Sequence, residues 1–227
     1  MDNKKIVLLA AEGNSTNIIY NAINKRFSVH TVIIEKRESK KLFIKRRIKR
    51  LGIINVGGQI LFQIIIVRIL NALSVKRIKS VIAENHLNIA KISGNRIIHT
   101  RSINDHSVIE LLQQIKPDVI IINGTRIISK KILDAVTCPF INTHAGITPM
   151  YRGVHGGYWA LVNCDKPNCG VTVHLVDEVI DTGSVLYQDS IHITKGDNFV
   201  TYHYLQTAQV LVILLRPVED SVQHKLK

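Results

Sequence analysis

The sequence predicts an α/β fold in which a mostly parallel, twisted sheet carries helices on both faces. Segments of strand length alternate with helix-like segments as far as Thr143, and this alternation is typical of a parallel sheet. The strand segments 7–11 and 119–122 are apolar at every position, as expected of strands buried on both faces. After Gly170, two strand-like segments follow each other directly, so we expect an antiparallel strand pair at the C-terminal end.

The order of the elements follows from the same patterns. We expect strands at 7–11, 28–34, 96–99, 119–122, 138–143, 171–175 and 184–193, and helices at 14–25, 40–51, 59–73, 75–85, 107–116 and 199–215. Gly57 and Gly58 are expected to break the chain before the helix at 59–73. Pro117 disfavours helix at the residue before it and so ends the helix at 107–116.

Length and composition indicate a single domain. A chain of 227 residues with 46% hydrophobic residues can bury a sizeable core. We therefore expect one domain over residues 1–227, with a variable basic and apolar helical stretch at 36–90. The chain leads straight into a strand, and no apolar run reaches the roughly 18 residues of a membrane span. We predict neither a signal peptide nor a spanning helix.

The cysteines indicate the compartment. Cys138, Cys164 and Cys169 form an odd and sparse set, so we expect free thiols in a cytoplasmic protein. Cys164 and Cys169 lack the spacing and the neighbouring ligands of a zinc site. We predict no metal.

The positive charge is concentrated in the first hundred residues. Residues 1–100 hold 19 Lys and Arg against 5 Asp and Glu, whereas residues 101–227 hold 11 against 12. Nine of the basic residues lie between Lys36 and Arg50. Such a cluster attracts the phosphates of a small substrate, a nucleic acid or a membrane surface, and it is also compatible with a solvated helix face.

The apolar segment 59–73 follows this basic cluster. Its polar interruptions are Gln63, Arg68 and Asn71. We expect a helix that packs on the domain or forms the seam of a homodimer. The alternative is an interfacial membrane helix beside the basic stretch, giving a weak contact with a membrane surface.

Polar clusters follow three of the predicted strands. Ligands of open parallel sheets bind outside the carboxyl ends of the strands. After the first strand, a turn and helix start offer backbone N–H groups to a phosphate or carboxylate, and the candidate substrate-binding residues there are Gly13, Asn14, Ser15 and Thr16. An ordinary helix cap is the alternative. The second cluster is the loop 123–126, which offers backbone donors and acceptors to a planar ring or is a plain turn.

The third cluster contains the strongest catalytic candidates. Asn142 and His144 are two residues apart on a strand and therefore point to the same face. A fixed amide donor beside an imidazole can stabilise an oxyanion and move a proton. Asp181 lies in a turn further along the chain and could orient the imidazole. The alternative for all three residues is a purely structural role. Asp181 in particular is a residue type that favours turns.

Two further histidines lie near this cluster in the sequence. His155 follows the loop after His144 and is a candidate contact to an amine substrate. His174 lies in an alternating strand, where a buried, hydrogen-bonded core histidine is the plain interpretation.

These motifs resemble a known family. Asn142-Thr143-His144, Pro149 five residues beyond the histidine, and Asp181-Thr182-Gly183 resemble the signature of the formyltransferases that use 10-formyltetrahydrofolate. The family includes glycinamide ribonucleotide transformylase, the catalytic domain of methionyl-tRNA formyltransferase and the sugar N-formyltransferases. The segment 170–177 also resembles the part before the family's catalytic aspartate. The resemblance is close over residues 117–195, partial over 5–23 and poor over 36–100.

The resemblance implies a fold, a reaction and a set of roles. The fold would be the Rossmann-like formyltransferase fold, and the reaction would transfer a formyl group from 10-formyltetrahydrofolate to a primary amine. Asn142 would donate a hydrogen bond to the formyl oxygen, His144 would stabilise the charge and shuttle a proton, and Asp181 would hold His144 and take the amine proton. The residues implied to line the folate pocket are Arg126, Ile128, Val176, Asp177, Val179 and Ile180.

Comparison of this sequence with the branches of the family reduces the number of candidate amine substrates. Methionyl-tRNA formyltransferase carries a further C-terminal domain, so we do not expect tRNA as the substrate. Ser15 stands where the purine enzyme usually has glycine, and Tyr151-Arg152-Gly153 is closer to the tRNA and sugar branches. We expect a nucleotide-linked amino sugar, whose phosphates the basic cluster could bind. Glycinamide ribonucleotide is the first alternative, and a non-catalytic relative that binds phosphate or nucleic acid is an alternative of another class.

Overall fold

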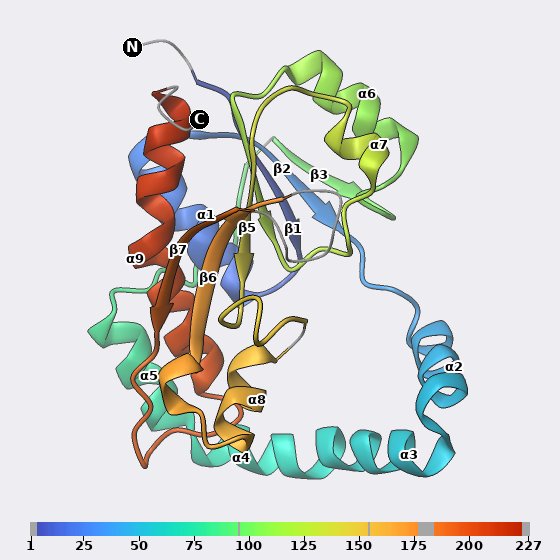
Figure 1. Cartoon of the computed structure of the whole chain (residues 1–227), viewed down its shortest axis with the longest axis vertical. Coiled ribbons are helices and arrows are strands. Elements are labelled where there is room, and N and C mark those ends of the chain that lie inside the picture. Colours follow the sequence, from blue (N-terminus) through green and yellow to red (C-terminus); the bar gives the residue numbers. More distant parts are fainter. Residues whose placement is uncertain (1–3, 95, 154, 177–183, 224–227) are drawn as a thin grey trace.

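A seven-stranded sheet forms the centre of the protein. The computed structural model describes residues 4–94, 96–153, 155–176 and 184–223, and the strand order is β3-β2-β1-β4-β5-β6-β7 (Figure 1). The strands are β1 (Ile6–Ala11), β2 (Val29–Glu35), β3 (Ile97–Thr100), β4 (Val119–Asn123), β5 (Phe140–His144), β6 (Gly170–Leu175) and β7 (Val185–Ser190). The first five are parallel, whereas β6 is antiparallel to β5 and β7 is antiparallel to β6. The predicted fold class is confirmed, including the antiparallel C-terminal pair.

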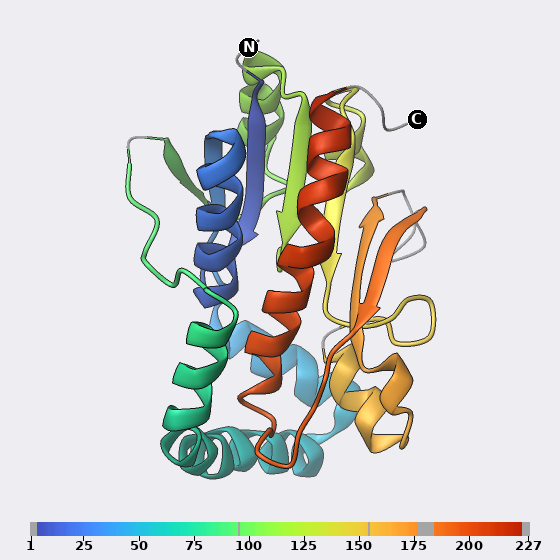
Figure 2. The same cartoon turned by 90° about the vertical axis from the view of Figure 1, so that its left-hand side faces the viewer.

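Helices cover both faces of the sheet. The helices α1 (Asn14–Phe27) and α9 (Tyr202–Val222) lie on one face, and α6 (His106–Ile115) and α7 (Lys130–Leu133) lie on the other (Figures 1 and 2). Successive residues of a strand point to opposite faces, so Leu8 of β1 packs in the core with α1 and α9, while Leu9 packs with α6. This division explains why β1 and residues 119–122 of β4 are apolar at every position.

Two shorter elements close the end of the sheet where β5 and β6 meet. They are α8 (Gly156–Val162) and the 3-10 turn η2 (Lys166–Asn168). A small core joins them to the start of α9, with Ala160, Cys169, Ile191 and Tyr202 all buried. All three cysteines are free.

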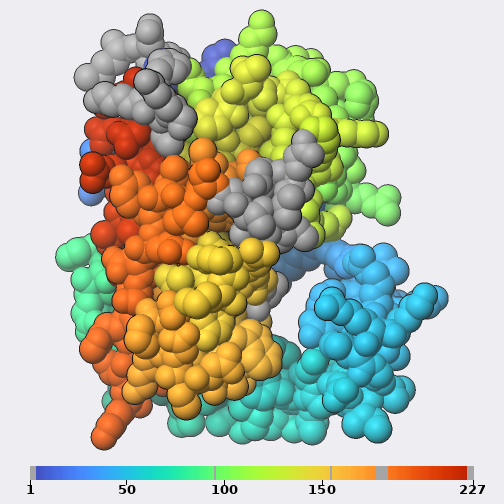
Figure 3. Space-filling model, in the orientation of Figure 1, coloured from blue at the N-terminus to red at the C-terminus, as the bar shows by residue number. Residues whose placement is uncertain are grey.

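Residues 36–73, which we call the arm, extend away from this body. The arm contains α2 (Lys40–Leu51), α3 (Ile53–Leu61), the π-helical turn η1 (Phe62–Ile66) and α4 (Val67–Leu73), and α5 (Val75–Glu84) returns the chain to the body. The parallel strands point their carboxyl ends toward the side of the molecule on which the arm lies (Figure 1). In the space-filling view, α2 and α3 stand apart from the body across an open gap (Figure 3).

The arm corrects two predictions. Gly57 and Gly58 do not break the chain but lie inside α3, because the cost of glycine in a helix, about 1 kcal/mol each, is outweighed by the rest of a long helical segment. The helix expected at 59–73 begins at Ile53, and little of it packs on the domain: Phe62 contacts Phe199, but only 6% of its most apolar window is buried.

The length and composition of this helix bear on the prediction that no helix spans a membrane. Ile53–Leu73 is 21 residues long with a mean hydropathy of 1.9, so by length and composition alone it could cross a membrane. Neutral polar residues such as Asn55, Gln59 and Gln63 divide the segment, so it contains no uninterrupted apolar run of membrane-spanning length.

Candidate active site

Asn142 is the middle residue and His144 the last residue of β5, which ends at the carboxyl edge of the sheet. β5 pairs with β4 on one side and with β6 on the other. The two side chains share one face of the strand, as their spacing predicts. Asn142 is half-buried and His144 is 8% exposed, so both lie at the boundary between the core and the open end of the sheet.

His174 orients the Asn142 amide. It lies directly opposite Asn142 in the antiparallel register of β5 and β6, and Asn142 Nδ2 is 3.0 Å from His174 Nε2. His174 Nδ1 is 2.9 Å from the carbonyl oxygen of Leu175. A carbonyl oxygen can only accept, so Nδ1 carries the hydrogen and Nε2 accepts from the Asn142 amide. One N–H of Asn142 is therefore fixed, and the direction of its second N–H is fixed with it.

His144 is held by the loop that follows it. Its Nε2 donates to the carbonyl oxygen of Tyr151 at 3.1 Å, so the neutral ring takes up a proton at Nδ1. This contact depends on a close approach of two glycines. A Cβ at Gly146 would lie 2.3 Å from the Tyr151 oxygen and 3.0 Å from Gly156 Cα. Only glycine at position 146 leaves room for the Tyr151 carbonyl beside His144.

Polar side chains, of which Thr172 and Gln206 are buried, fix the loop on the far side of His144. Thr172 Oγ1 donates to the Gly146 oxygen at 2.7 Å and accepts from the Thr148 N–H at 3.1 Å. Gln188 Nε2 donates to the Thr148 oxygen at 2.6 Å, and Gln206 Nε2 donates to the Ala145 oxygen at 3.1 Å. The chain between His144 and a cis Thr148-Pro149 peptide is therefore tied to β6, β7 and α9.

The third predicted catalytic residue, Asp181, lies outside the described residues. The same is true of the predicted folate contacts Asp177, Val179 and Ile180. For these four residues the sequence prediction stands untested.

The other predicted folate contacts lie near one another beyond β4 and β5. Ile128 and Val176 both pack against the hydrophobic core on the α6 face, and the Val176 N–H donates to the Phe140 oxygen at 2.8 Å. Arg126 is exposed, and its guanidinium donates to the Lys36 oxygen at 3.2 Å. Ile128 and Val176 thus share one hydrophobic core, whereas Arg126 lies exposed beside Lys36.

Glu35 holds this loop and was missed in the sequence. The residue ends β2 and is only 4% exposed. Its carboxylate accepts the Ile103 N–H at 2.8 Å and the Arg126 N–H at 2.9 Å. The two backbone donors satisfy this buried carboxylate. A signal was available, because a charged residue directly after the apolar run 32–34 is unusual for a buried strand.

The first polar cluster opens α1 beside these residues. Thr16 is 2% exposed, and its hydroxyl donates to the Ala11 oxygen at 2.5 Å and accepts from Asn123 Nδ2 at 2.9 Å. Ser15 accepts from the same Asn123 amide at 3.2 Å, and Asn14 donates to the Tyr204 hydroxyl at 3.0 Å. Asn123 Oδ1 accepts from Thr143 at 3.1 Å. The network joins the ends of β1, β4 and β5, and the Gly13 turn lies next to it.

His155 belongs to an aromatic cluster between the loop and α9. Its Nδ1 is 2.7 Å from the Tyr202 hydroxyl, and its ring centroid is 5.3 Å from that of Phe199. Burial, and then the positive charge of Arg47, lower the pKa of His155. The arm reaches the same cluster, since Phe62 contacts Phe199 edge-on at 5.4 Å between ring centroids.

No cluster suited to a metal was found in the described part of the chain. Within residues 4–94, 96–153, 155–176 and 184–223, no three His, Cys, Asp or Glu side chains come together as metal ligands would. The chemistry that these residues support is hydrogen bonding to a developing oxyanion and proton transfer.

Comparison with known proteins identifies the family. Residues 68–210, more than half of the chain, match the family described as Formyl transferase. The chain belongs to the formyl transferase family. The matched region contains β3 to β7 together with Asn142, His144 and Asp181, and it begins inside the arm.

Two relatives that are longer than this chain carry the same name. Methionyl-tRNA formyltransferase of Finegoldia magna is 38% identical over 133 residues, which are 57% of this chain and 42% of the relative. Methionyl-tRNA formyltransferase of Syntrophus aciditrophicus is 32% identical over 130 residues, or 41% of its own length. The chain thus spans about two fifths of the curated relatives it matches.

Solved structures share the fold at low sequence identity. Phosphoribosylglycinamide formyltransferase from Streptococcus pneumoniae TIGR4 aligns with a TM-score of 0.59 and 20% identity, covering 97% of this chain and 99% of that one. A sugar N-formyltransferase from Shewanella sp. aligns with a TM-score of 0.56 and 17% identity, covering 97% of this chain and 70% of that one. These alignments establish that this chain has the same fold.

Proposed function

We propose that this protein transfers the formyl group of 10-formyltetrahydrofolate to the primary amine of a small, phosphate-bearing substrate. The observation that carries the proposal is the pair Asn142 and His144 at the carboxyl end of β5, with the Asn142 amide oriented by His174 at 3.0 Å. A preorganised N–H donor stabilises negative charge better than water because it need not reorient during the reaction.

The residues divide the reaction between charge stabilisation and proton transfer. The amine nitrogen attacks the formyl carbon, and the formyl oxygen gains negative charge. The second N–H of Asn142 donates to that oxygen, and the His144 ring lies beside it. The new bond joins the formyl carbon to the substrate amine, the bond from that carbon to the donor nitrogen breaks, and the proton lost by the amine is passed to the departing nitrogen. His144 Nδ1 and Asp181 are the groups proposed to move it.

The described residues fit a folate as co-substrate. 10-Formyltetrahydrofolate supplies the formyl group. Its flat ring has two apolar faces and a hydrogen-bonding edge, which suits Ile128 and Val176 bordered by the backbone of residues 124–128. Glu35 holds that backbone at Arg126, and Asn104 holds it through the Ile127 oxygen at 2.9 Å and the Ser129 N–H at 2.8 Å. Asp177, Val179 and Ile180 complete the proposed pocket. We further propose that the enzyme is cytoplasmic and uses no metal.

For the amine we propose a nucleotide-linked amino sugar. The start of α1 at Gly13 and Asn14 presents N–H groups at the carboxyl edge of the sheet, and α2 places seven basic residues on the same side of the molecule. Both features suit a diphosphate. His155 is the proposed contact near the amine.

Two other amines remain candidates for specific reasons. The relatives of Finegoldia magna and Syntrophus aciditrophicus are methionyl-tRNA formyltransferases, which favours an aminoacyl-tRNA. The likeness to phosphoribosylglycinamide formyltransferase over 97% of the chain favours glycinamide ribonucleotide. A relative that binds phosphate without catalysis is the candidate of another class.

The test is a formyl-transfer assay on a panel of amines. Purified protein would be given 10-formyltetrahydrofolate with nucleotide-linked amino sugars, glycinamide ribonucleotide or methionyl-tRNA, and release of tetrahydrofolate would be followed. We expect turnover on an amino sugar, with Asn142→Ala lowering kcat by about 10²–10³ and His144→Ala by about 10²–10⁴. His192→Ala, which replaces an exposed histidine, is the matched control and should leave turnover unchanged.

Each other outcome has a definite meaning. Turnover on tRNA or glycinamide ribonucleotide alone would keep the reaction and replace the substrate. Turnover that survives both substitutions would contradict the catalytic assignment. Binding of phosphate without binding of folate would favour the non-catalytic relative.

A further inference from the structure

We propose that the arm docks the protein on an anionic phospholipid membrane, with the helix Ile53–Leu73 lying in the plane of the interface. This inference does not use the proposed catalytic residues. It assigns the basic residues of α2 to anionic lipid headgroups, whereas the proposed function offers the same residues to a substrate diphosphate, so the test below contains no substrate. The inference rests on the exposure of the helix, on the charge beside it, and on the way both ends of the arm return to the body.

The helix exposes apolar side chains on more than one face. The largest exposed fractions are those of Ile53 (71%), Ile54 (87%), Leu61 (59%), Ile64 (51%), Ile69 (51%) and Leu73 (77%). Only Val56 of α3 is buried, and neither η1 nor α4 has a buried residue. A helix that is apolar around most of its circumference is stable in water only when something covers it.

The charge of the neighbouring helix identifies the covering surface. α2 carries seven basic and no acidic residues and has no buried residue. Arg46 of α2 forms an ion pair with Glu38. Lys76 and Lys79, just beyond the other end of the apolar helix, are also exposed. Basic residues beside an exposed apolar helix match anionic headgroups above an apolar membrane interior.

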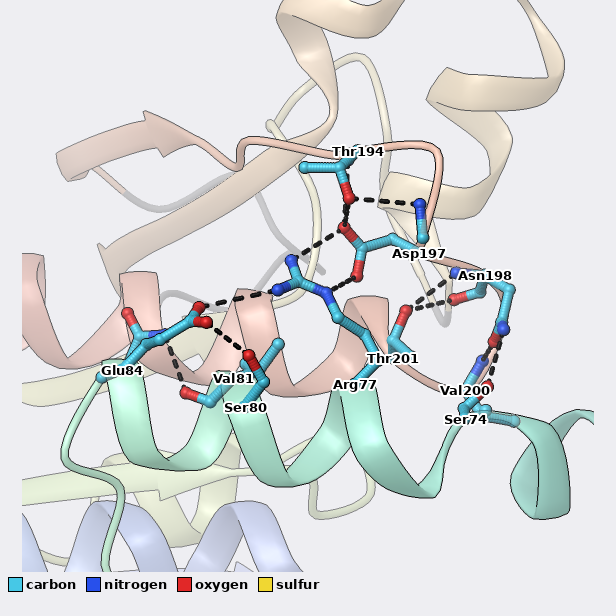
Figure 4. Close-up of polar contacts among 12 residues, drawn as sticks. Ser74, Arg77, Ser80, Val81, Glu84, Thr194, Asp197, Asn198, Val200 and Thr201 are labelled. Carbon is cyan, nitrogen blue, oxygen red and sulfur yellow. Dashed lines mark hydrogen bonds and ion pairs between the residues drawn. The ribbon is translucent and has the colours of Figure 1, made fainter.

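The root of the arm is fixed to the body. Arg77 of α5 donates from Nε to Asp197 Oδ1 at 2.9 Å and from Nη2 to Oδ2 at 3.0 Å (Figure 4). Asn198 Nδ2 donates to the Ser74 hydroxyl at 2.7 Å. The apolar helix is therefore anchored to the body at Ser74, one residue beyond its end at Leu73.

The topology favours a helix that lies in the interface over one that spans the membrane. β2 precedes the arm and β3 follows it, and the two strands pair in one sheet. A single crossing of about 30 Å would place Ile53 on the far side of the membrane from Leu73. The chain would then have to bring α2 and its seven charges back through the hydrocarbon to reach β2. An interfacial helix leaves α2, α5 and the sheet on the same side.

A second copy of this chain is a poorer match than a membrane. In a two-fold dimer, each helix would face its own counterpart. A parallel pairing would bring two copies of α2 together, and an antiparallel pairing would bring α2 close to the partner's basic α5. Either arrangement juxtaposes like charges, whereas an anionic surface complements both ends of the helix.

The test is flotation of the full chain with lipid vesicles, without substrate or folate. One vesicle preparation would be phosphatidylcholine alone, and the other phosphatidylcholine with about a third phosphatidylglycerol. We expect at least tenfold tighter partition to the anionic vesicles, weakened by salt. The triple variant Ile64→Gln, Ile65→Gln, Ile69→Gln and the double variant Lys45→Glu, Lys49→Glu should each lose at least tenfold.

Matched controls separate docking from misfolding. Val212→Gln on α9, where Val212 is 70% exposed, and the exposed Lys131→Glu should bind like the wild type. Circular dichroism would establish that every variant is folded. Equal binding to both vesicle types, no binding to either, or variants that bind like the controls would overturn the proposal. A dimer in buffer that the isoleucine variants dissociate, without any vesicle binding, would assign the helix to a second copy instead.

Discussion

At the scale of single residues, the site depends on how the Asn142 amide is held. An unrestrained asparagine side chain can rotate, and its oxygen and nitrogen can exchange places. The His174 ring prevents this, because its Nδ1 donates to the Leu175 oxygen and leaves Nε2 to accept from Asn142. His174 is 2% exposed, so water cannot easily replace it. It is a positioning residue rather than a catalytic one.

Replacement of His174 should therefore affect the rate more than substrate binding. We expect His174→Ala to lower kcat by about tenfold to hundredfold, less than the loss of the oxyanion donor itself, with KM for the amine changed little. His174→Gln can place its side-chain oxygen where Nε2 accepts, so it should recover most of the rate. Steady-state kinetics with the accepted amine would measure both. A Gln variant as slow as the Ala variant, or a rise in KM alone, would assign His174 a purely structural role.

The residues of the site were predictable to different degrees. Asn142 and His144 were found because their spacing places them on one face at the end of a buried strand. His174 was taken for a core histidine, because its contact with Asn142 arises only when β6 pairs with β5 in one particular register. Glu35 was missed for a similar reason: its partners, Ile103 and Arg126, are 68 and 91 residues away along the chain. Local patterns contain no information on such distant pairings.

At the scale of elements, the attachment of α5 to the loop before α9 has a pH dependence. The Asp197 side chain is fully buried and Arg77 is 26% exposed. Burial raises the pKa of Asp197, but the hydrogen bonds from Arg77, and then those from Thr194, outweigh it and hold this pKa well below its usual value. A carboxyl with a depressed folded-state pKa stabilises the fold above its unfolded pKa, about 3.9, and this stability is lost as the pH falls below that value.

Removal of this carboxylate should follow the same pH window. Asp197→Asn should lower the free energy of unfolding by about 2–3 kcal/mol at neutral pH, because it leaves Arg77 without its charged partner. The difference from the wild type should be constant from about pH 7 to 5 and shrink below about pH 4. Urea unfolding across this range would measure it. Asp134→Asn, which breaks an ion pair with 60% exposure on both sides, should cost less than about 0.5 kcal/mol, and an equal effect of the two variants would contradict the argument.

The elements themselves were mostly predictable, and the exceptions have physical causes. All seven strands and the helices α1, α5, α6 and α9 followed from their patterns, because the spacing of apolar residues reflects the burial of one or both faces. The short helices α7 and α8, of four and seven residues, were not predicted, because so few residues contain little helical periodicity. The last helix extends to Val222 and passes through Pro217, where a stop at Leu215 was expected. The helix at 53–73 was placed six residues too late and expected to be covered, because sequence patterns record how apolar a segment is and not whether a partner covers it.

At the scale of the whole molecule, the protein consists of a well-packed body and an arm with almost no core of its own. In β1, Ile6 to Ala10 are fully buried, and in β4 Val119 to Ile121 are fully buried. In the arm, Val56 is the buried apolar residue of α3, and α2 has no buried residue. Local opening costs little where few apolar contacts are lost. The two parts should therefore differ in stability although they belong to one chain.

Hydrogen exchange measured by mass spectrometry should separate the two parts and report on what covers the arm. In buffer, we expect amides of β1, β4 and α9 to exchange slowly and those of α2 and 53–73 to exchange at least a hundredfold faster, because the arm can open without breaking the core. With anionic vesicles, exchange in 53–73 should slow by about tenfold or more while the body is unchanged. Vesicles of phosphatidylcholine alone are the control, since they offer the same apolar interior without the charge. Slow exchange of the arm in buffer at every protein concentration would contradict this division, because it would mean that the arm is covered within the single chain. Protection of the arm that grows with protein concentration would mean that copies of the chain cover each other.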